Sequence, residues 1–257
     1  MNFPKKPRVL VYFTVLLSSA ITTIAATITA QAQAWQCRVP ANLPRPHAEQ
    51  SIPSQIRRTP VAGYTLALSW SREYCKSQNG KSMQCDGSIG DFGFILHGLW
   101  PEGMGQIKGH NSGANYPQYC RKAAVLPRAV VAQNICMMPG VQLLQHEWTK
   151  HGTCMTRKPE TYFKAARVMF GAIEFPDMDM LSRQYKSGKP LTAAGLANAF
   201  AANNKGLPAN ALSIKTGRSG WLQEVHICLA KNFKPRRCAG NTQGARGPAE
   251  IKIWRGS

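Results

Sequence analysis

The sequence predicts an α+β fold: a central antiparallel sheet with flanking helices, in a single disulfide-stapled domain. Short apolar runs rich in β-forming residues alternate with segments whose apolar residues recur at helical spacing. All eight cysteines follow an apolar N-terminal segment, which predicts disulfides in an exported chain. The 257 residues show no internal repeat, flexible linker or heptad pattern, so one domain is the simplest architecture.

The N-terminus has the composition of a signal peptide, which we place at residues 1–34 and expect to be removed. The first eight residues carry two lysines and one arginine, and Val9 to Ile28 is apolar and free of acids. Ala32 to Ala34 (Ala-Gln-Ala) forms a small-x-small cleavage site. A retained membrane anchor is the alternative, which the Thr and Ser residues in the apolar run disfavour. We therefore expect an exported protein, periplasmic or secreted, without stable membrane association after the signal is removed.

The mature chain is expected to begin with a proline-rich arm, residues 35–62, tied down at Cys37. A folded domain at residues 63–257 follows. Its first strand is predicted at Tyr64 to Trp70 (YTLALSW), because this run is short, apolar and rich in β-formers. A polar loop with a turn signal then joins Cys75 to Cys85.

A second strand is predicted at Phe92 to Trp100 (FGFILHGLW). We expect it to break at Gly98 and at residues 101–103, which would leave His97 at a junction between strand and loop. Such junctions often carry functional groups, although a histidine in an apolar strand is about as often a core residue.

Helices and further strands are predicted along the rest of the chain. His226 falls in one of these strands, where we expect a packing role, and His110 falls in a Gly-rich loop, where we expect no catalytic role. The helices are expected at residues 126–138, 145–152, 159–173 and 193–202, the strands at 211–216, 221–229 and 251–254, and the loop at 103–119.

Residues 145–154 (QHEWTKHGTC) concentrate ionisable side chains in one segment. At 100° per residue, a helix places four of them on one side, while Trp148 points away and can anchor the segment in apolar surroundings. A solvated polar face is the alternative. Two imidazoles beside a carboxylate and an ammonium favour a functional site, because each group shifts the pKa of the others. The four residues are His146, Glu147, Lys150 and His151.

The charge of the chain favours a polyanionic partner. The net charge is +20, and removing residues 1–34 takes away two Lys, one Arg and no acid, which leaves +17. Nucleic acid is the first candidate, followed by an anionic membrane or cell-wall polymer. Only twelve acids are present, so a two-metal site built from carboxylates is hard to assemble. We expect no cofactor and no required metal.

Two other chemistries fit residues 145–154 poorly. The zinc signature His-Glu-x-x-His is one residue shorter than the spacing from His146 to His151, and Lys150 would repel a dication. Cys154 as a nucleophile is disfavoured, since its thiol is expected in a disulfide. Metal-free cleavage of RNA fits better, because two histidines can supply an acid and a base for attack of the ribose 2′-OH on the adjacent phosphate, and a lysine can stabilise the charge that develops.

Two segments resemble the active-site segments of the ribonuclease T2 family: residues 94–101 (FILHGLWP) and 146–154 (HEWTKHGTC). The resemblance spans about Tyr64 to Cys154 and, more loosely, the rest of the chain. It implies an α+β catalytic domain at residues 63–257. It also implies endonucleolytic cleavage of single-stranded RNA with low base specificity, through a 2′,3′-cyclic phosphate to 3′-phosphate ends, without a metal.

The resemblance also implies a role for each matching residue. His97 would donate a proton to the leaving oxygen, and His151 would be the general base. Glu147 and Lys150 would orient and stabilise the phosphoryl group. Phosphate and base binding would involve His146, Trp100 and Glu102, the last two in a pocket where a base stacks on an aromatic ring.

The resemblance implies a disulfide between Cys120 and Cys154. Local spacing predicts Cys75 with Cys85 and Cys228 with Cys238, and elimination leaves Cys37 with Cys136. We expect a monomer whose partner is its RNA substrate. A cationic RNA-binding protein with vestigial hydrolysis is the alternative function, because charge alone would explain RNA binding.

Overall fold

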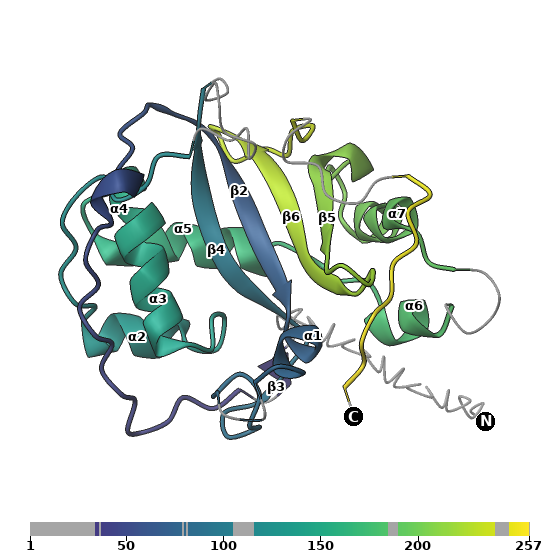
Figure 1. The fold of residues 1–257 in the computed structure, drawn as a ribbon, viewed down its shortest axis with the longest axis horizontal. Helices are drawn as coiled ribbons and strands as arrows, with labels where there is room; N and C mark the ends of the chain where they lie inside the picture. Colours follow the sequence, from purple (N-terminus) through teal and green to yellow (C-terminus); the bar gives the residue numbers. More distant parts are fainter. Residues whose placement is uncertain are drawn as a thin grey trace, which may run out of the picture.

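A four-stranded antiparallel sheet forms the centre of the fold in a computed structural model of the chain (Figure 1). The strand order is β4-β2-β6-β5. The strands are β2 (Val61–Trp70), β4 (Phe94–Gly103), β5 (Leu212–Thr216) and β6 (Leu222–Ala230). The structure describes residues 34–35, 37–78, 80, 82–104, 116–184, 190–239 and 247–256, so the predicted signal segment up to residue 33 and His110 lie outside it.

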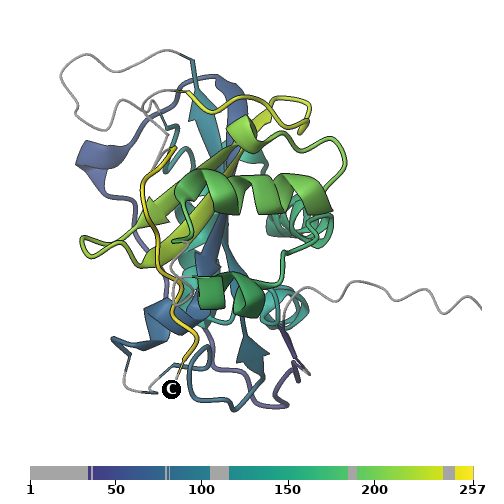
Figure 2. The same cartoon turned by 90° about the vertical axis from the view of Figure 1, so that its right-hand side faces the viewer.

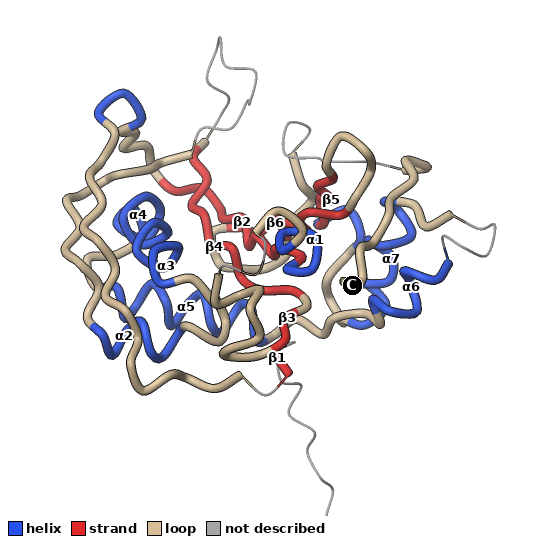
Figure 3. The backbone as a smooth tube through the Cα atoms, turned by 60° about the horizontal axis from the view of Figure 1, so that its bottom comes forward, coloured by secondary structure: helices blue, strands red, loops and turns tan. Residues whose placement is uncertain are grey.

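Helices flank this sheet in two groups, as the views in Figures 1 and 2 show. One group lies beside β4 and the other beside β5, so that the strands in Figure 3 run between them. The first group contains α2 (Arg128–Asn134), α3 (Val141–Glu147), a π-helical turn (Trp148–Gly152), α4 (Thr153–Met155) and α5 (Pro159–Gly171); the second contains α6 (Met178–Gln184) and α7 (Ala193–Asn203). The predicted α+β fold is confirmed.

Several shorter elements complete the described chain. Helix α1 (Ser71–Cys75) follows β2 directly, and two short strands, β1 (Ala34–Trp35) and β3 (Asp91–Phe92), pair with each other outside the main sheet. Two 3-10 turns lie at Pro53–Gln55 and Ala209–Ala211.

The core lies between the sheet and the helices and is rich in aromatic rings. Phe94 of β4 stacks on Phe175 with a centroid distance of 5.3 Å and meets Phe200 of α7 edge-on at 5.6 Å. Helix α5 buries Tyr162 and Phe163 completely. The hydroxyl of Tyr162 donates to the carbonyl of Leu99 at 3.3 Å, so helix α5 is bonded to β4 close to His97.

Several elements differ from the sequence prediction in their bounds, and one predicted strand is not formed. The helix expected at residues 126–138 is confined to α2, and the one expected at 159–173 ends at Gly171. The predicted strand at 251–254 is wrong: this segment makes an isolated bridge from Lys252 to Trp221 instead. Its position is held by single hydrogen bonds, such as the one that the Trp70 indole donates to the carbonyl of Trp254 at 2.7 Å.

All four predicted disulfides are present. Cys37–Cys136 spans 99 residues and ties the proline-rich arm to the end of α2, while Cys120–Cys154 spans 34 residues. The two local bridges, Cys75–Cys85 and Cys228–Cys238, each span 10 residues. The two long bridges add most, because a crosslink that closes a longer loop removes more entropy from the unfolded chain.

The proline-rich arm lies along the first group of helices, where it follows the outer side of α3 in Figure 1. The backbone N–H of His47 donates to the side chain of Gln142 on α3 at 2.9 Å. Further along, Arg57 and Gln118 exchange two backbone hydrogen bonds, each 3.0 Å long. The arm is therefore fixed to the folded domain at several points.

Candidate active site

His97 occupies a β-bulge in the middle of β4. Ala67 of β2 pairs with Gly98 and Leu68 pairs with Leu96, so His97 is the extra residue between the two pairs. The predicted break after His97 is wrong, since β4 continues to Gly103. A bulge changes the direction of the side chain of the extra residue. The orientation of His97 is therefore set by a bulge within the strand and not by a loop after it.

Gly98 is required by the close approach of two side chains and not by a turn. A Cβ at this position would lie within 3.0 Å of the Glu147 carboxyl and of the Trp100 indole nitrogen, a separation that Cβ atoms essentially never show. These two groups are bonded to each other: the Trp100 indole N–H donates to Glu147 Oε2 at 2.8 Å. Strand β4 and helix α3 are thus joined by this hydrogen bond, which lies so close to the backbone of Gly98 that no side chain fits there.

The segment expected to be a regular helix contains a π-helical turn at its centre. Helix α3 ends at Glu147, and the turn Trp148–Gly152 carries Lys150 and His151. The extra backbone residue in such a turn is a common feature of functional sites. Trp148 is buried and packs near Tyr162, so its predicted anchoring role is confirmed.

The structure brings His97 and His151 to the same indole ring. The His97 ring meets Trp100 edge-on with a centroid distance of 5.1 Å, and the His151 ring lies at 5.5 Å with an interplanar angle of 30°. His97 is about one-third exposed at 33%, whereas His151 is 6% exposed. Two histidines from segments some fifty residues apart in sequence therefore line one site.

The two imidazoles are tuned in opposite directions. Burial alone would lower the pKa of His97, but the hydrogen bond to Glu224 and the charges of Glu147 and Glu224 outweigh it and raise the pKa above its ordinary value. Burial lowers the pKa of His151 well below its ordinary value, and the charges of Lys150, His146 and His97 act in the same direction. At neutral pH this arrangement favours a protonated His97 and a neutral His151.

Glu147 is buried beneath these rings. Burial raises the pKa of its carboxyl, against the charges of His97 and His146 and the hydrogen bond from Trp100. Its Oε1 lies 3.7 Å from Nε2 of His97. Glu147 therefore faces the nitrogen of His97 that is not bonded to Glu224.

Two residues of β6 lie beside His97, and one of them, Glu224, is absent from the sequence prediction. Glu224 contacts Nδ1 of His97 at 2.5 Å and Nε2 of His226 at 2.6 Å. The His226 side chain is 12% exposed and its ring meets Trp100 edge-on at 5.2 Å, so the predicted packing role is confirmed, and the contact with Glu224 adds to it. The alternation of strand side chains places residues 224 and 226 on one face, a signal that was available in the sequence.

Lys150 and His146 lie at the edge of the same site. The charge of Lys150 lowers the pKa of both His97 and His151. The carbonyl of Lys150 accepts a hydrogen bond from the backbone N–H of Tyr119 at 2.8 Å. His146 is partly exposed, and its Nδ1 lies 2.7 Å from the carboxylate of Glu49 in the arm.

Trp100 and Glu102, predicted to form a base pocket, have different surroundings. Trp100 lies among the catalytic candidates, bonded to Glu147 as described above. Glu102 is buried at 8% exposure; it accepts a hydrogen bond from Thr65 and forms an ion pair with Arg236. Burial and the charge of Glu102 raise the pKa of Tyr116 to about 12, so that this phenol remains neutral.

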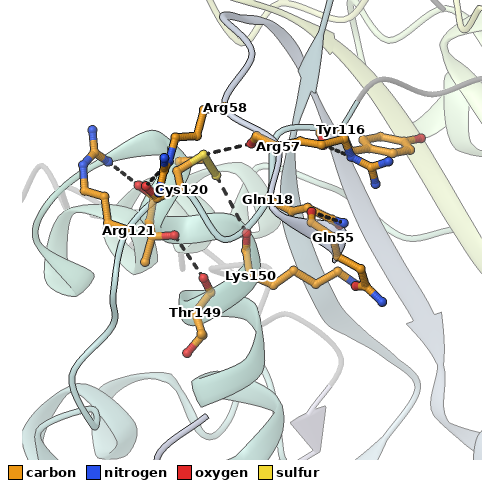
Figure 4. Close-up of a disulfide and its surroundings, with 11 residues drawn as sticks. Gln55, Arg57, Arg58, Tyr116, Gln118, Cys120, Arg121, Thr149 and Lys150 are labelled. Carbon is orange, nitrogen blue, oxygen red and sulfur yellow. Dashed lines mark hydrogen bonds between the residues drawn. A yellow bond between two sulfur atoms is a disulfide. The ribbon is translucent and has the colours of Figure 1, made fainter. Parts of the chain in front are cut away.

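The disulfide Cys120–Cys154 fastens the segment 146–154 to residues 116–121 and, through them, to the arm (Figure 4). Arg57 donates to the carbonyl of Tyr116 at 3.1 Å, and Arg58 donates to the carbonyl of Cys120 at 3.2 Å. Arg121 donates to the carbonyl of Thr153. Three arginine side chains thus fasten the backbone around this disulfide.

Replacing both Cys120 and Cys154 by Ser is expected to destabilise the fold by about 3–4 kcal/mol, as loop entropy gives for a bridge of this span. The bridge also closes the end of the segment 146–154. We therefore expect activity to fall as well, even at temperatures below the midpoint of unfolding. Thermal unfolding and RNA cleavage of the double variant test this. An unchanged melting temperature would show that the bridge contributes nothing. The Cys75–Cys85 double variant, with a 10-residue loop, is the matched control and should lose less.

Neither a metal cluster nor a membrane-spanning helix is found in the described part of the chain. Among these residues no group of three or more His, Cys, Asp or Glu side chains is arranged to hold a metal ion. No helix there is both long and apolar enough to cross a membrane.

The fold and the two site-bearing segments place this chain in a known family. A model of the ribonuclease T2 family matches residues 62–238, and the chain belongs to that family. Among curated relatives, a ribonuclease of Aeromonas hydrophila is 31% identical over 168 residues, which cover 65% of this chain and 71% of the relative. A probable ribonuclease of Haemophilus influenzae is 33% identical over 136 residues, which cover 49% of this chain and 48% of the relative. The match thus spans about half the length of the latter.

Solved structures share the fold. RNase NT, crystallised in complex with 5′-AMP, superposes with a TM-score of 0.53 at 18% identity, over 76% of this chain and 99% of that one. Ribonuclease MC1 from bitter gourd seeds superposes with a TM-score of 0.51 at 22% identity, over 74% and 99% of the two chains. At these identities the likeness concerns the fold.

Proposed function

We propose that this chain is an endoribonuclease that cleaves single-stranded RNA with low base specificity, without a metal. Cleavage would pass through a 2′,3′-cyclic phosphate and end in a 3′-phosphate. The observation that carries the proposal is the pair His97 and His151, which contact one indole ring and have pKa shifts of opposite sign. Membership of the ribonuclease T2 family supports it.

In the first step the neutral His151 removes the proton from the ribose 2′-OH. The 2′-oxygen attacks the adjacent phosphorus, the bond from phosphorus to the 5′-oxygen breaks, and the protonated His97 gives its proton to the leaving oxygen. In the second step the roles reverse: His97 takes a proton from water, and His151 returns one to the 2′-oxygen as the cyclic ester opens. Each histidine ends the cycle in its starting state.

The other residues would act on the phosphate and the base. The ammonium of Lys150 would stabilise the negative charge that develops on the phosphoryl oxygens. Glu147 would orient that group, and the partly exposed ring of His146 would bind a phosphate. Trp100 and, with Arg236 and Tyr116 beside it, Glu102 remain proposed contributors to a base pocket.

Single-stranded RNA is the proposed partner, and we propose that the protein is exported and acts as a monomer. A relative of the same fold binds 5′-AMP, and variants of another bind 5′-UMP or 5′-GMP. The excess of positive charge on this chain suits the same class of ligand.

The pH dependence of cleavage should be a wide bell. Activity needs His151 neutral, and its lowered pKa keeps it neutral below the ordinary imidazole value of about 6.5. Activity also needs His97 protonated, and its raised pKa keeps it so above that value. In a profile of kcat/KM against pH, the rising limb reports His151 and should have its midpoint below pH ~6.5. The falling limb reports His97 and should have its midpoint above this value. Two limbs that both lie on the same side of this value would contradict the assignment.

Replacing Glu49 by Gln is expected to lower the KM for RNA by about 2- to 5-fold, the worth of one partly exposed ion pair. The Glu49 carboxylate pairs with Nδ1 of His146, and its negative charge repels a phosphate that would bind the same ring. Steady-state kinetics test this, with Glu250→Gln, an exposed carboxylate on another part of the surface, as the control. An unchanged or higher KM would contradict a phosphate-binding role for His146.

The function is tested by incubating the purified protein with RNA in EDTA and analysing the ends of the products. Fragments with 2′,3′-cyclic phosphate and 3′-phosphate ends are expected. RNA that stays intact but is retarded on a gel would instead favour the cationic binding protein, which the high positive charge also supports. Both functions predict binding that weakens with salt, so salt dependence does not separate them.

A further inference from the structure

We propose that Glu224 and His226, both on β6, form a positioning pair that holds the imidazole of His97 in the orientation and tautomer required for proton donation. The proposal rests on the proposed ribonuclease function and adds two residues to it. Neither residue belongs to the segments 94–101 and 146–154, on which the resemblance to the family was first seen.

The Glu224 carboxylate bridges the two imidazoles. Its Oε1 lies 2.5 Å from Nδ1 of His97, and its Oε2 lies 2.6 Å from Nε2 of His226. An ionised carboxylate only accepts hydrogen bonds, so both ring nitrogens must be donors. The two histidine bonds lower the pKa of Glu224 far below its ordinary value in spite of burial, which keeps the carboxylate ionised.

The hydrogen bond from Nδ1 fixes the direction of the other ring nitrogen. Nε2 of His97 then faces Glu147, 3.7 Å from its Oε1, and is the nitrogen that would give its proton to the leaving oxygen. A carboxylate at one nitrogen that orients an imidazole for work at the other is a recurring arrangement in acid–base catalysis.

The sheet explains how these side chains meet. Glu224 pairs with Ser69 of β2 and His226 pairs with Ala67, so both point to the face on which the bulged His97 lies. The side chains of Ser69 and Ala67 are small, and this leaves room for Glu224 to reach across β2. Ser69 also donates to Glu224 Oε1 at 3.4 Å.

His226 holds the second oxygen of Glu224. Burial lowers the pKa of His226, so the ring is neutral and its Nε2–H is the donor. The same ring meets the edge of Trp100 at 5.2 Å, which ties the pair to the indole that both catalytic histidines contact. Glu224 therefore cannot rotate away from His97 without breaking a second, short hydrogen bond.

Charged groups from four elements act on these two histidines. Glu147, at the end of α3, raises the pKa of His97, and Lys150, in the π-helical turn that continues α3, lowers it. Glu224 on β6 raises it, while Lys215 on β5 and His97 on β4 lower the pKa of His226. Removing the charge of Glu224 leaves Glu147 as the sole acid among these groups.

Glu224→Gln tests the proposal, because glutamine keeps the shape and removes the charge. In NMR titrations without RNA, the pKa of the His97 ring should be lower than in the wild type. The falling limb of the kcat/KM profile should move to lower pH by the same amount. We expect kcat to fall by about 10- to 100-fold, as found for carboxylates that orient a histidine from its second nitrogen, with KM within about 2-fold. Glu160→Gln, an exposed carboxylate on α5, is the control and should change none of these.

His226 provides a second, independent pair of variants. His226→Gln can still donate to Glu224 and should keep most of kcat, whereas His226→Phe cannot and should lose about 10-fold, as expected for one orienting hydrogen bond. Equal activity of the two variants would overturn the role of His226. A folded Glu224→Gln protein with an unchanged His97 titration would overturn the proposal as a whole. The titration needs no catalysis, so it separates this failure from a wild type that does not cleave RNA.

Discussion

His97→Ala and His151→Ala are each expected to lower kcat/KM for RNA by about 10² to 10⁴-fold, the usual worth of a general acid or base. The two changes should leave the fold intact. His97 sits in a bulge on one side of the Trp100 ring and His151 lies against the same ring, so each change removes one imidazole from the site and leaves the sheet pairing in place.

Initial-rate measurements on both variants check this, together with thermal unfolding to show that they are folded. His47→Ala is the matched control, because His47 is an exposed imidazole on the arm. Full activity of either catalytic variant would refute its assigned role. Loss of activity in the His47 variant would show that the assay responds to any missing histidine.

Gly98→Ala is expected to have an effect of similar size on activity although it adds only a methyl group. The new Cβ would lie within 3.0 Å of the Glu147 carboxyl and the Trp100 indole nitrogen, so one of them must move. Either movement breaks the hydrogen bond between them and shifts the ring that both histidines contact. Overpacking of this kind typically costs about 1–3 kcal/mol of stability. A displacement of about 1 Å at a catalytic centre can cost about 10²-fold in rate.

The control is Gly171→Ala at the end of α5, where an added Cβ meets nothing within 4 Å. This variant should match the wild type in activity and be equally stable or slightly more so, because alanine is the better helix former. If Gly98→Ala were as active as Gly171→Ala, the close contact of Glu147 and Trp100 with the strand backbone would not be required for activity.

The strands and helices could be predicted from residue patterns because each buries one apolar face. β2 (Val61–Trp70) and β6 (Leu222–Ala230) lie within three residues of their predicted ends. The bulge at His97 could not be predicted, since it depends on how β4 pairs with β2 and not on β4 itself. The glycine that looked like a strand end is instead the point where α3 crosses the strand.

The site was predicted in part. Segments 94–101 and 146–154 identified the two histidines, and the structure places both rings at Trp100. Glu224 was missed because its partner His97 is 127 residues away in sequence, and only the order of strands in the sheet brings them together. The contact of Glu49 in the arm with His146 was missed for the same reason, at a separation of 97 residues.

The most direct test of the proposed division of labour uses an RNA dinucleotide in which sulfur replaces the leaving 5′-oxygen. A thiolate leaves without being protonated, because a thiol is far more acidic than an alcohol. His97→Ala should then cleave this substrate within about 10-fold of the wild-type rate, while His151→Ala should remain slower by about 10²-fold or more. Equal impairment of both variants on the sulfur substrate, or rescue of the His151 variant alone, would contradict the assignment of His97 as acid and His151 as base.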